Sequence, residues 1–287
     1  MRFRVVRRDA VAGIAASRDG RAWRALFEGD PDFPGLLSDI VRRGGDALSP
    51  AARQIEHSGA AVDLASLETL VPFPRPGKLL CVGLNYLDHC KEGGMAVPDY
   101  PTLFARFSTG LVAHGQPLVA PRESDLFDYE SELVVVIGKA GRRISEADAL
   151  DHVVGYTIFN DGSVRDYQLR TPQWTIGKNF DGTGALGPDF VTADELPAGA
   201  EGLRIQGRLN GRTVQDSSIS DMVFGVRKLV SLISVAMTLE AGDLIATGTP
   251  AGVGGARKPP LLLKDGDVFE VEIERIGVLR NPVVKER

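Results

Sequence analysis

Two glutamates, Glu130 and Glu132, stand two positions apart just before the apolar run 133–137. Alternate side chains of a β-strand share a face, so a strand here points both carboxylates the same way. The apolar residues that follow leave no polar face, which predicts a strand buried on both sides. Neighbouring buried anions repel each other unless one is protonated or a cation lies between them, and oxygen ligands suit Mg²⁺ or Mn²⁺. A solvated strand end is the alternative interpretation of the pair.

A third carboxylate, Asp161, ends another apolar stretch in the sequence Asn160-Asp161-Gly162. Alone it would be explained as an Asx-turn or a helix N-cap. Combined with the glutamate pair it completes a set of three carboxylates. Such a set leaves positions on a cation for a bidentate substrate and a water molecule.

His89 and Glu92 are spaced i,i+3 in a predicted helix that follows a short strand. Residues with that spacing share a helix face, so Glu92 can orient the imidazole and raise its basicity for acid–base work. A surface ion pair on the helix is the competing interpretation. The following Gly93-Gly94 could let this segment close over a site as a lid.

Further polar residues stand at predicted strand and helix ends. Gln168 ends a predicted helix, and Lys178 lies in a largely apolar setting where its ammonium needs an anionic partner. Gly248 and Thr249 follow a predicted strand, and their small size lets backbone N–H groups and the hydroxyl approach an anion. A plain turn explains that loop equally well.

Other chemistries lack their sequence signatures. Residues 182–187 match G-x-G-x-x-G, but a predicted strand follows instead of the helix that a dinucleotide needs, so we expect a loop and no NAD site. No Walker A sequence and no G-x-S-x-G motif is present. A net charge of −5 and a pI of about 5.5 give no electrostatic argument for binding nucleic acid or an anionic membrane.

Length and composition bound the class of protein and its compartment. The 287 residues, 43% hydrophobic and 25% charged, suffice for one large domain or for a small and a larger one. No apolar run approaches the ~20 residues of a membrane span, and no signal peptide is recognisable, so we expect a cytoplasmic protein. The two cysteines, Cys81 and Cys90, fit a reducing compartment.

The order of predicted elements divides the chain into two parts and a connector. Residues 1–71 are predicted to form a small α/β domain, with strands at 2–8 and 11–17 and helices near 33–43 and 50–58. Residues 72–77, with three prolines, form a stiff linker. Beyond it, short strands separated by glycine turns favour an α+β or β-rich roll. We expect a hairpin at Asn210-Gly211, helices at 86–92, 145–150, 164–169 and 223–238, and strands at 78–82, 102–107, 129–138, 153–160, 203–209, 243–247, 268–275 and 278–283.

Six strings resemble the fumarylacetoacetate hydrolase family from about residue 78 to the C-terminus, in content and in order: VGLNYLDHCKE, PTLFARFSTGL, DYESELVVVIGK, GYTIFNDGSVRDYQ, QWTIGKNFD and GDLIATGTPAGVG. The resemblance implies an α+β fold whose catalytic domain, 78–287, is a mixed β-sandwich roll. It also implies assembly as a homodimer. Residues 1–71 are similar to the short N-terminal domain of the longer bacterial members.

The resemblance also implies roles for single residues. Many relatives have Lys-Pro where this chain has Ala105-Arg106-Phe107, so the planar guanidinium of Arg106 could select a different distal group of the substrate. The other implied roles are a Mg²⁺ or Mn²⁺ site on Glu130, Glu132 and Asp161, a water-activating pair His89 and Glu92, substrate-polarising Gln168 and Lys178, and a carboxylate-binding Thr249 beside Gly248.

The substrates that the resemblance implies are 2-oxo acids of the acylpyruvate type. We therefore predict a metal-dependent hydrolase that cleaves a C–C bond in an acylpyruvate or 2,4-diketo acid to give pyruvate plus a carboxylic acid. His89 would take a proton from the attacking water, while Lys178 and Gln168 hold the enolate charge. An isomerase of a 2-hydroxy-dienedioate and an oxaloacetate-type decarboxylase need the same metal and are alternatives, as is a non-catalytic metal-binding protein. No sequence code identifies the acyl tail of the substrate.

Overall fold

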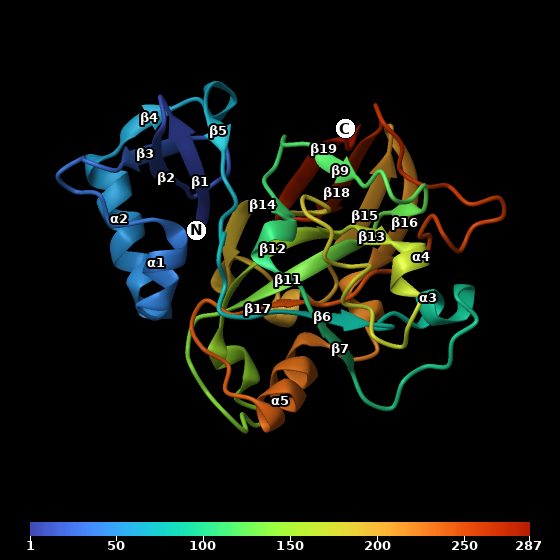
Figure 1. Ribbon diagram of the computed structural model, residues 1–287. Helices are drawn as coiled ribbons and strands as arrows, with labels where there is room; N and C mark the ends of the chain where they lie inside the picture. Colours follow the sequence, from blue (N-terminus) through green and yellow to red (C-terminus); the bar gives the residue numbers. More distant parts are fainter.

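The computed structural model describes all 287 residues, which form two large packed β-sheets, a two-stranded sheet of β10 and β13, and short helices around them (Figure 1). A twelve-stranded sheet has the strand order β4-β3-β2-β1-β14-β12-β11-β17-β6-β7, with β5 paired to β1 and β8 paired to β14. A five-stranded sheet has the order β16-β15-β18-β19-β9 and packs across β11 and β12. The chain therefore has the predicted α+β fold. No helix in it is long and apolar enough to span a membrane.

The elements of the N-terminal part are β1 (Arg2–Arg8), β2 (Val11–Ser17), β3 (Trp23–Phe27), α1 (Leu37–Arg42), α2 (Leu48–Ser58), β4 (Ala60–Val62) and β5 (Glu68–Thr69). The larger part contains β6 (Leu79–Gly83), α3 (Leu87–Glu92), β7 (Thr102–Ala105), β8 (Leu111–Val112), β9 (Leu118–Ala120), β10 (Phe127–Asp128), β11 (Ser131–Ile137), β12 (Val153–Asp161), β13 (Ser163–Val164), α4 (Arg165–Gln168), β14 (Gly184–Thr192), β15 (Arg204–Leu209), β16 (Arg212–Ser218), α5 (Val226–Ala236), β17 (Leu244–Ala246), β18 (Val268–Ile273) and β19 (Gly277–Lys285).

Strand β11 contains Glu132 and directly follows Glu130 in the interior of the molecule. All of its residues are buried, as the apolar run predicted. Leu133 and Val135 face the core between the two sheets, whereas Val134 and Val136 face a second core that includes side chains of α1 and α2. Because both faces of β11 are covered, its start is a fixed platform for the carboxylates.

The N-terminal part shares its sheet and its core with the rest of the chain. Strand β1 pairs antiparallel with β14, with Phe3 opposite Phe190. Those two side chains lie in the same buried cluster as Phe73, which stacks edge-on against Phe190. The segment 72–77 contains no helix or strand. The division of the chain into domains stays a prediction.

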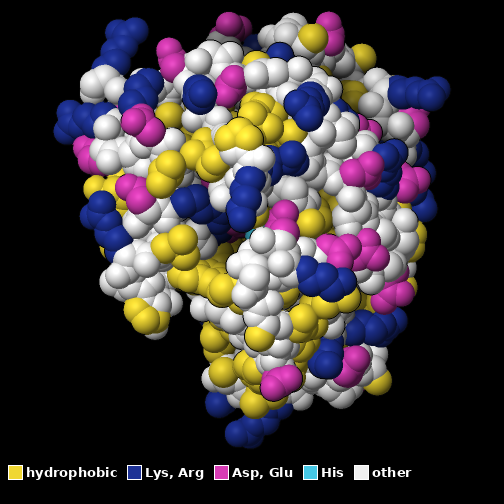
Figure 2. Space-filling model, turned by 90° about the vertical axis from the view of Figure 1, so that its right-hand side faces the viewer, with side chains coloured by type: hydrophobic (Ala, Val, Ile, Leu, Met, Phe, Trp, Pro, Cys, Tyr) yellow, Lys and Arg dark blue, Asp and Glu magenta, His cyan; other side chains and the backbone are white.

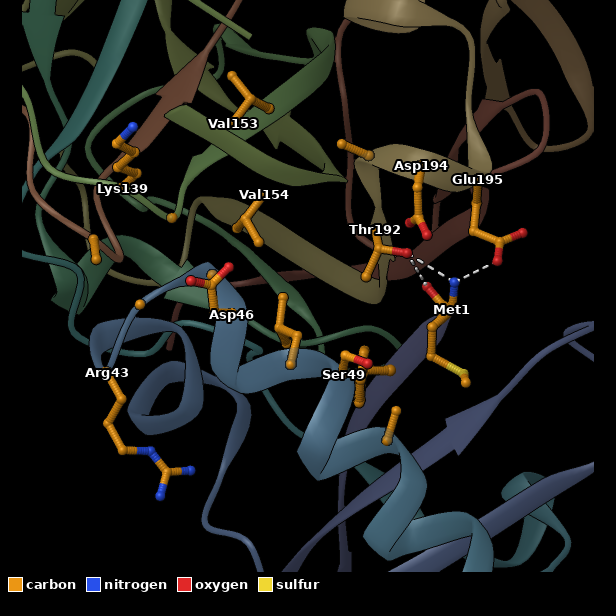
Figure 3. Close-up of a pocket in the computed structure, with 18 of the residues that line it drawn as sticks. Met1, Arg43, Asp46, Ser49, Lys139, Val153, Val154, Thr192, Asp194 and Glu195 are labelled. Atoms are coloured by element: carbon orange, nitrogen blue, oxygen red, sulfur yellow. Dashed lines mark hydrogen bonds and ion pairs between the residues drawn. The ribbon is translucent and has the colours of Figure 1, made fainter. Parts of the chain in front are cut away.

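A groove of about 930 Å³ separates α2 from the ends of β12 and β14 (Figure 3). On one side of it the amino group of Met1 donates to Oγ1 of Thr192 and contacts Oε1 of Glu195, both at 2.7 Å. Elsewhere the N–H of Gly45 donates to the carbonyl of Gly138 at 2.8 Å. The two parts of the chain therefore touch at both edges of the groove, beyond the continuous sheet.

Two local predictions were wrong. No α-helix forms at 145–150, because Ser145 exchanges hydrogen bonds with Asp148 and closes a turn that leads into a single 3₁₀ turn at Ala149–His152. Residues 184–187 lie in β14 and not in a loop, but β14 leads into another 3₁₀ turn, so the helix that a dinucleotide requires is absent. The predicted hairpin is confirmed, since Asn210 and Gly211 both have positive φ, as a type I′ turn requires.

Candidate metal centre and active site

Three predicted metal ligands meet where β11 begins and β12 ends. Glu132 lies on β11, Asp161 is the last residue of β12, and Glu130 directly precedes β11. The N–H of Asp161 donates to the carbonyl of Glu130 at 2.9 Å, which ties the two segments together. One oxygen from each carboxylate lies within 4.8 Å of the others, and all three residues are buried.

Lys178 compensates two of the three carboxylates. Its Nζ lies 2.7 Å from Oε2 of Glu130 and 2.8 Å from Oδ2 of Asp161. Burial works to lower the pKa of Lys178, but the two negative charges outweigh burial and raise that pKa. Burial likewise works to raise the pKa of Glu130, but the charges of Lys178 and Arg165 dominate and lower it to about 2.

Glu132 has no cationic partner. The only hydrogen bond of its side chain is the one that Oε2 accepts from the N–H of Gly248, at 3.1 Å. Burial and the charges of Asp161 and Glu130 hold its pKa well above its usual range. A cation would stabilise an uncompensated buried carboxylate that lies beside two others. Because all of the donor atoms are oxygens, the set fits a hard divalent ion. The residues present therefore fit the metal that the sequence implied.

The predicted histidine–glutamate pair forms on α3. Nδ1 of His89 lies 2.8 Å from Oε1 of Glu92, and Oε2 of Glu92 accepts the N–H of Gly252 at 2.8 Å. A carboxylate only accepts hydrogen bonds, so this contact places the ring proton on Nδ1 and leaves Nε2 with its lone pair free. The pair also fastens α3 to the loop that follows β17.

A cavity of about 380 Å³ is lined by two of the three clustered carboxylates and by His89. The face of the molecule that carries α3 and α4 is hollowed near its centre in Figure 2, with hydrophobic side chains beside the hollow. The predicted site residues that line the cavity are His89, Glu92, Glu130, Glu132, Gln168, Lys178 and Thr249.

Two polar side chains are held with a donor group free for a ligand. Oε1 of Gln168 accepts from Nη1 of Arg165 at 2.8 Å, so the amide nitrogen of Gln168 is available. Oγ1 of Thr249 accepts from Nε2 of Gln215 at 2.8 Å, which leaves the hydroxyl proton available. Both groups suit an anionic substrate.

The geometry puts Arg106 and Gly248 in other places than the sequence suggested. Arg106 is fully buried, and its guanidinium binds Oδ1 of Asp161 at 2.5 Å and the hydroxyl of Thr183 at 2.9 Å. It does not line the cavity, so it cannot select a distal substrate group by contact. The N–H of Gly248 is used by Glu132 instead of by a ligand. Both residues hold carboxylates of the cluster in place.

Sequence reasoning missed Arg165 and Asp128. Arg165 lines the cavity and binds Oε1 of Glu130 at 2.7 Å and Oδ2 of Asp128 at 2.8 Å. Asp128 is fully buried and also accepts the N–H groups of Gly254 and Gly255. The alternation Asp128, Glu130, Glu132 was a usable signal, because it extends the same-face carboxylate pattern by one step.

Comparison with known proteins identifies the family. The model of the fumarylacetoacetate (FAA) hydrolase C-terminal domain matches residues 78–284. The chain belongs to the fumarylacetoacetate hydrolase family. A mitochondrial oxaloacetate tautomerase of Xenopus laevis is 41% identical over 89% of this chain and 80% of its own length, and a human one is 42% identical over 89% and 82%.

Solved structures agree with this family assignment. A fumarylacetoacetate hydrolase from Exiguobacterium antarcticum is 34% identical, with a TM-score of 0.86 and full coverage of both chains. A 2-hydroxyhepta-2,4-diene-1,7-dioate isomerase from Mycobacterium marinum is 32% identical, with a TM-score of 0.76 and coverage of 100% of this chain and 99% of its own. Relatives in this family thus carry the names of a tautomerase, a hydrolase and an isomerase on one architecture.

Proposed function

We propose that this family member is a divalent-metal-dependent enzyme that interconverts the enol and keto forms of a 2-oxo acid. The observation that carries the proposal is the His89–Glu92 pair, which lines the same cavity as two of the three clustered carboxylates. A base beside a cation site is what proton transfer next to a carbonyl requires. The oxaloacetate tautomerases that are 41–42% identical to the chain support the same reaction type.

The metal would be Mg²⁺ or Mn²⁺, held by Glu130, Glu132 and Asp161. When bound, it supplies Lewis acidity and a fixed positive charge for a substrate carboxylate and its 2-oxo oxygen. Arg106 and Gly248 keep two of these carboxylates in position through the contacts described above.

The protein's own groups then handle substrate and proton. The hydroxyl of Thr249 donates to the substrate carboxylate, and the amide of Gln168 donates to an oxygen of the oxo acid. Nε2 of His89 removes a proton from the carbon next to the 2-oxo group, and the C–H electron pair becomes the enolate double bond. Lys178 lies beside Glu130 and Asp161, where its charge favours the developing enolate oxygen. Return of a proton to that oxygen gives the enol.

Hydrolysis of an acylpyruvate is the second candidate, and the size of the cavity favours it. About 380 Å³ is in the range of sites for molecules much larger than a four-carbon acid. In this reaction His89 takes a proton from water, the hydroxide adds to the 4-oxo carbon, and the C–C bond breaks to leave pyruvate enolate and a carboxylic acid. A dienedioate isomerase and an oxaloacetate decarboxylase use the same base and cation.

One experiment separates these reactions. The Mg²⁺-loaded protein is incubated with enol oxaloacetate, an acylpyruvate and a 2-hydroxy-dienedioate, and products are followed by absorbance and NMR. We expect metal-dependent loss of the enol with keto acid as the product. Pyruvate plus a carboxylic acid from the acylpyruvate establishes hydrolysis instead, and CO₂ release establishes decarboxylation. No metal-dependent turnover of any of the three contradicts the proposal.

The remaining expectations concern assembly and location. We propose a homodimer that acts on a small 2-oxo acid, binds no nucleic acid or membrane, and resides in the cytoplasm. Size-exclusion chromatography coupled to light scattering tests the dimer, and cell fractionation tests the location. The named tautomerase relatives are mitochondrial, so fractionation includes the organelle fraction where the source cell has one.

A further inference from the structure

The active-site cavity is lined by side chains of two kinds. The charged and polar ones are Glu130, Glu132, Arg165, Lys178, Gln168, Thr249 and the His89–Glu92 pair. Large side chains with no charge line it as well: Leu84, Met95, Phe104, Leu169, Trp174 and Val253. A substrate whose 2-oxo acid group is bound by the polar residues therefore has apolar side chains available for its remaining atoms.

No unpaired Lys or Arg lines the cavity. Apart from His89, the cavity is lined by two basic residues, Arg165 and Lys178. Both form ion pairs with Glu130, and each has a second carboxylate partner, Asp128 for Arg165 and Asp161 for Lys178. A second substrate carboxylate among the apolar side chains would thus be desolvated without a partner, which is costly.

The apolar wall is built by an aromatic pair. The rings of Phe104 and Trp174 meet edge-to-face with centroids 5.8 Å apart, and Nζ of Lys178 lies 5.1 Å from the centroid of Phe104. Trp174 occupies the space beside Gly83, where a Cβ would come within 2.1 Å of its ring. The aromatic pair therefore places apolar surface beside Lys178.

The mouth of the cavity is also apolar. Leu169 is 72% exposed and Met95 is 46% exposed, although both are large hydrophobic side chains that line the cavity. An apolar group on a ligand that reached the mouth would remove part of these surfaces from water, which favours binding.

We propose that the substrate carries a single carboxylate and an apolar tail, as a 2,4-dioxo acid with a phenyl or branched alkyl group on C4 does. This inference rests on the proposed function, because it uses the 2-oxo acid group as the anchor. Such a substrate differs from those in the names of the relatives, because oxaloacetate and 2-hydroxyhepta-2,4-diene-1,7-dioate each carry two carboxylates.

A matched pair of substrates tests the inference. The Mg²⁺-loaded protein receives 2,4-dioxo-4-phenylbutanoate or a 2,4-dioxo acid of similar length whose tail ends in a carboxylate. We expect kcat/KM for the phenyl compound to be at least about 10-fold higher. An equal or higher value for the dicarboxylate overturns the inference.

Calorimetric titration keeps this test separate from that of the proposed function. If neither compound is turned over but the phenyl acid binds at least about 10-fold more tightly, the proposed function fails and the inference stands. If both are turned over without preference, the inference fails and the proposed function stands.

Variants locate the effect in the apolar wall. Leu169→Lys places a cation at the mouth on a side chain exposed enough that folding is not at risk, and it should lower the phenyl preference by about 10-fold, through KM. Trp174→Ala should lower it in the same way. Tyr100→Ala, an exposed aromatic outside the cavity, is the control and keeps the preference. An unchanged preference in both wall variants contradicts the inference.

Discussion

At the scale of single residues, the carboxylates depend on buried partners that hold them in one geometry. Arg106 is the clearest example, because its guanidinium lies wholly inside the protein against Asp161. Breaking a buried ion pair from one side leaves an uncompensated charge, which costs about 3–5 kcal/mol. We therefore expect Arg106 to affect the reaction through Asp161 and not through the substrate tail.

We expect Arg106→Ala to destabilise the protein by about 3–5 kcal/mol, measured by urea unfolding. Arg106→Lys should lower kcat/KM by a similar factor for substrates with short and long tails, because the substitution changes the position of Asp161 and not a contact with the tail. Arg204→Lys, in the exposed pair with Asp216, is the matched control and changes stability by less than about 1 kcal/mol. A tail-dependent effect of Arg106→Lys would restore Arg106 to the distal substrate site.

We expect Glu132 to destabilise the metal-free protein. The pKa of Glu132 is higher in the folded protein than its value near 4.5 in the unfolded chain. Ionisation of Glu132 therefore lowers the free energy of unfolding above about pH 4.5, and the loss grows as the pH rises toward the folded-state pKa. We expect Glu132→Gln, with EDTA present, to stabilise the protein at pH 8 by about 1–3 kcal/mol, and by less at pH 5. Added Mg²⁺ should stabilise only the wild type, which then becomes more stable than Glu132→Gln.

Urea unfolding at the two pH values checks this prediction, with Glu240→Gln as an exposed control beside Lys78. A wild type that is more stable than Glu132→Gln in EDTA at pH 8 would show that Glu132 is not an uncompensated carboxylate.

Much of the candidate site could be predicted because short sequence patterns mark its residues. Glu130 and Glu132 alternate at the start of an apolar run, and His89 and Glu92 are one helical turn apart. The partners of Arg106 and Arg165 could not be predicted in this way. Arg106 and Asp161 are 55 residues apart, and only the pairing of strands brings them together.

At the scale of elements, α3 is a short helix whose position depends on Glu92. Its carboxylate joins His89 to the N–H of Gly252, so a single side chain sets both the ring tautomer and the distance between helix and loop. Loss of either bond should loosen α3 and misorient the base.

We expect Glu92→Gln to lower kcat by about 100-fold while metal affinity changes little, because an amide cannot accept both hydrogen bonds. Hydrogen exchange at Gly252 should accelerate in the same variant, which reports the lost bond directly. Asp88→Asn removes an exposed i,i+3 pair with Lys91 on the same helix and serves as the control. Wild-type kcat in Glu92→Gln would remove Glu92 from the mechanism.

Elements were predictable where burial decides them and not where local side chains compete. The buried run in β11 fixed that strand, and Asn210-Gly211 fixed the β15–β16 turn. At 145–150 the Ser145–Asp148 turn replaced the predicted helix. In 184–187 the glycines looked like a loop, but strand pairing with β12 overrides their weak propensity.

At the scale of the whole molecule, one sheet runs from the N-terminal part into the catalytic part (Figure 1). Phe3 on β1 packs with Phe190 on β14, so the hydrophobic core of the first 71 residues is continuous with that of the rest. The sequence predicted a separate domain because the prolines at 72–77 mark a connector, but such a signal does not reveal whether the parts share a core.

We expect Phe3→Ala to destabilise the entire chain by about 3–5 kcal/mol in one cooperative transition. Circular dichroism and intrinsic fluorescence during urea unfolding should give coincident curves. Phe107→Ala, on an exposed side chain, should change stability by no more than about 0.5 kcal/mol. Two separate transitions, with only the first affected by Phe3→Ala, would establish that residues 1–71 fold independently.

The proposed activity requires a buried carboxylate site for a divalent cation and the His89 base to act together on a 2-oxo acid. The most direct test measures Mn²⁺ affinity and the rate of enol-to-keto conversion in wild type, His89→Gln and Glu132→Gln. We expect His89→Gln to bind Mn²⁺ like the wild type but to react at least about 100-fold more slowly, whereas Glu132→Gln should lose both Mn²⁺ binding and activity. A wild-type rate in His89→Gln, or loss of Mn²⁺ from it, would show that His89 is not the base beside the cation site.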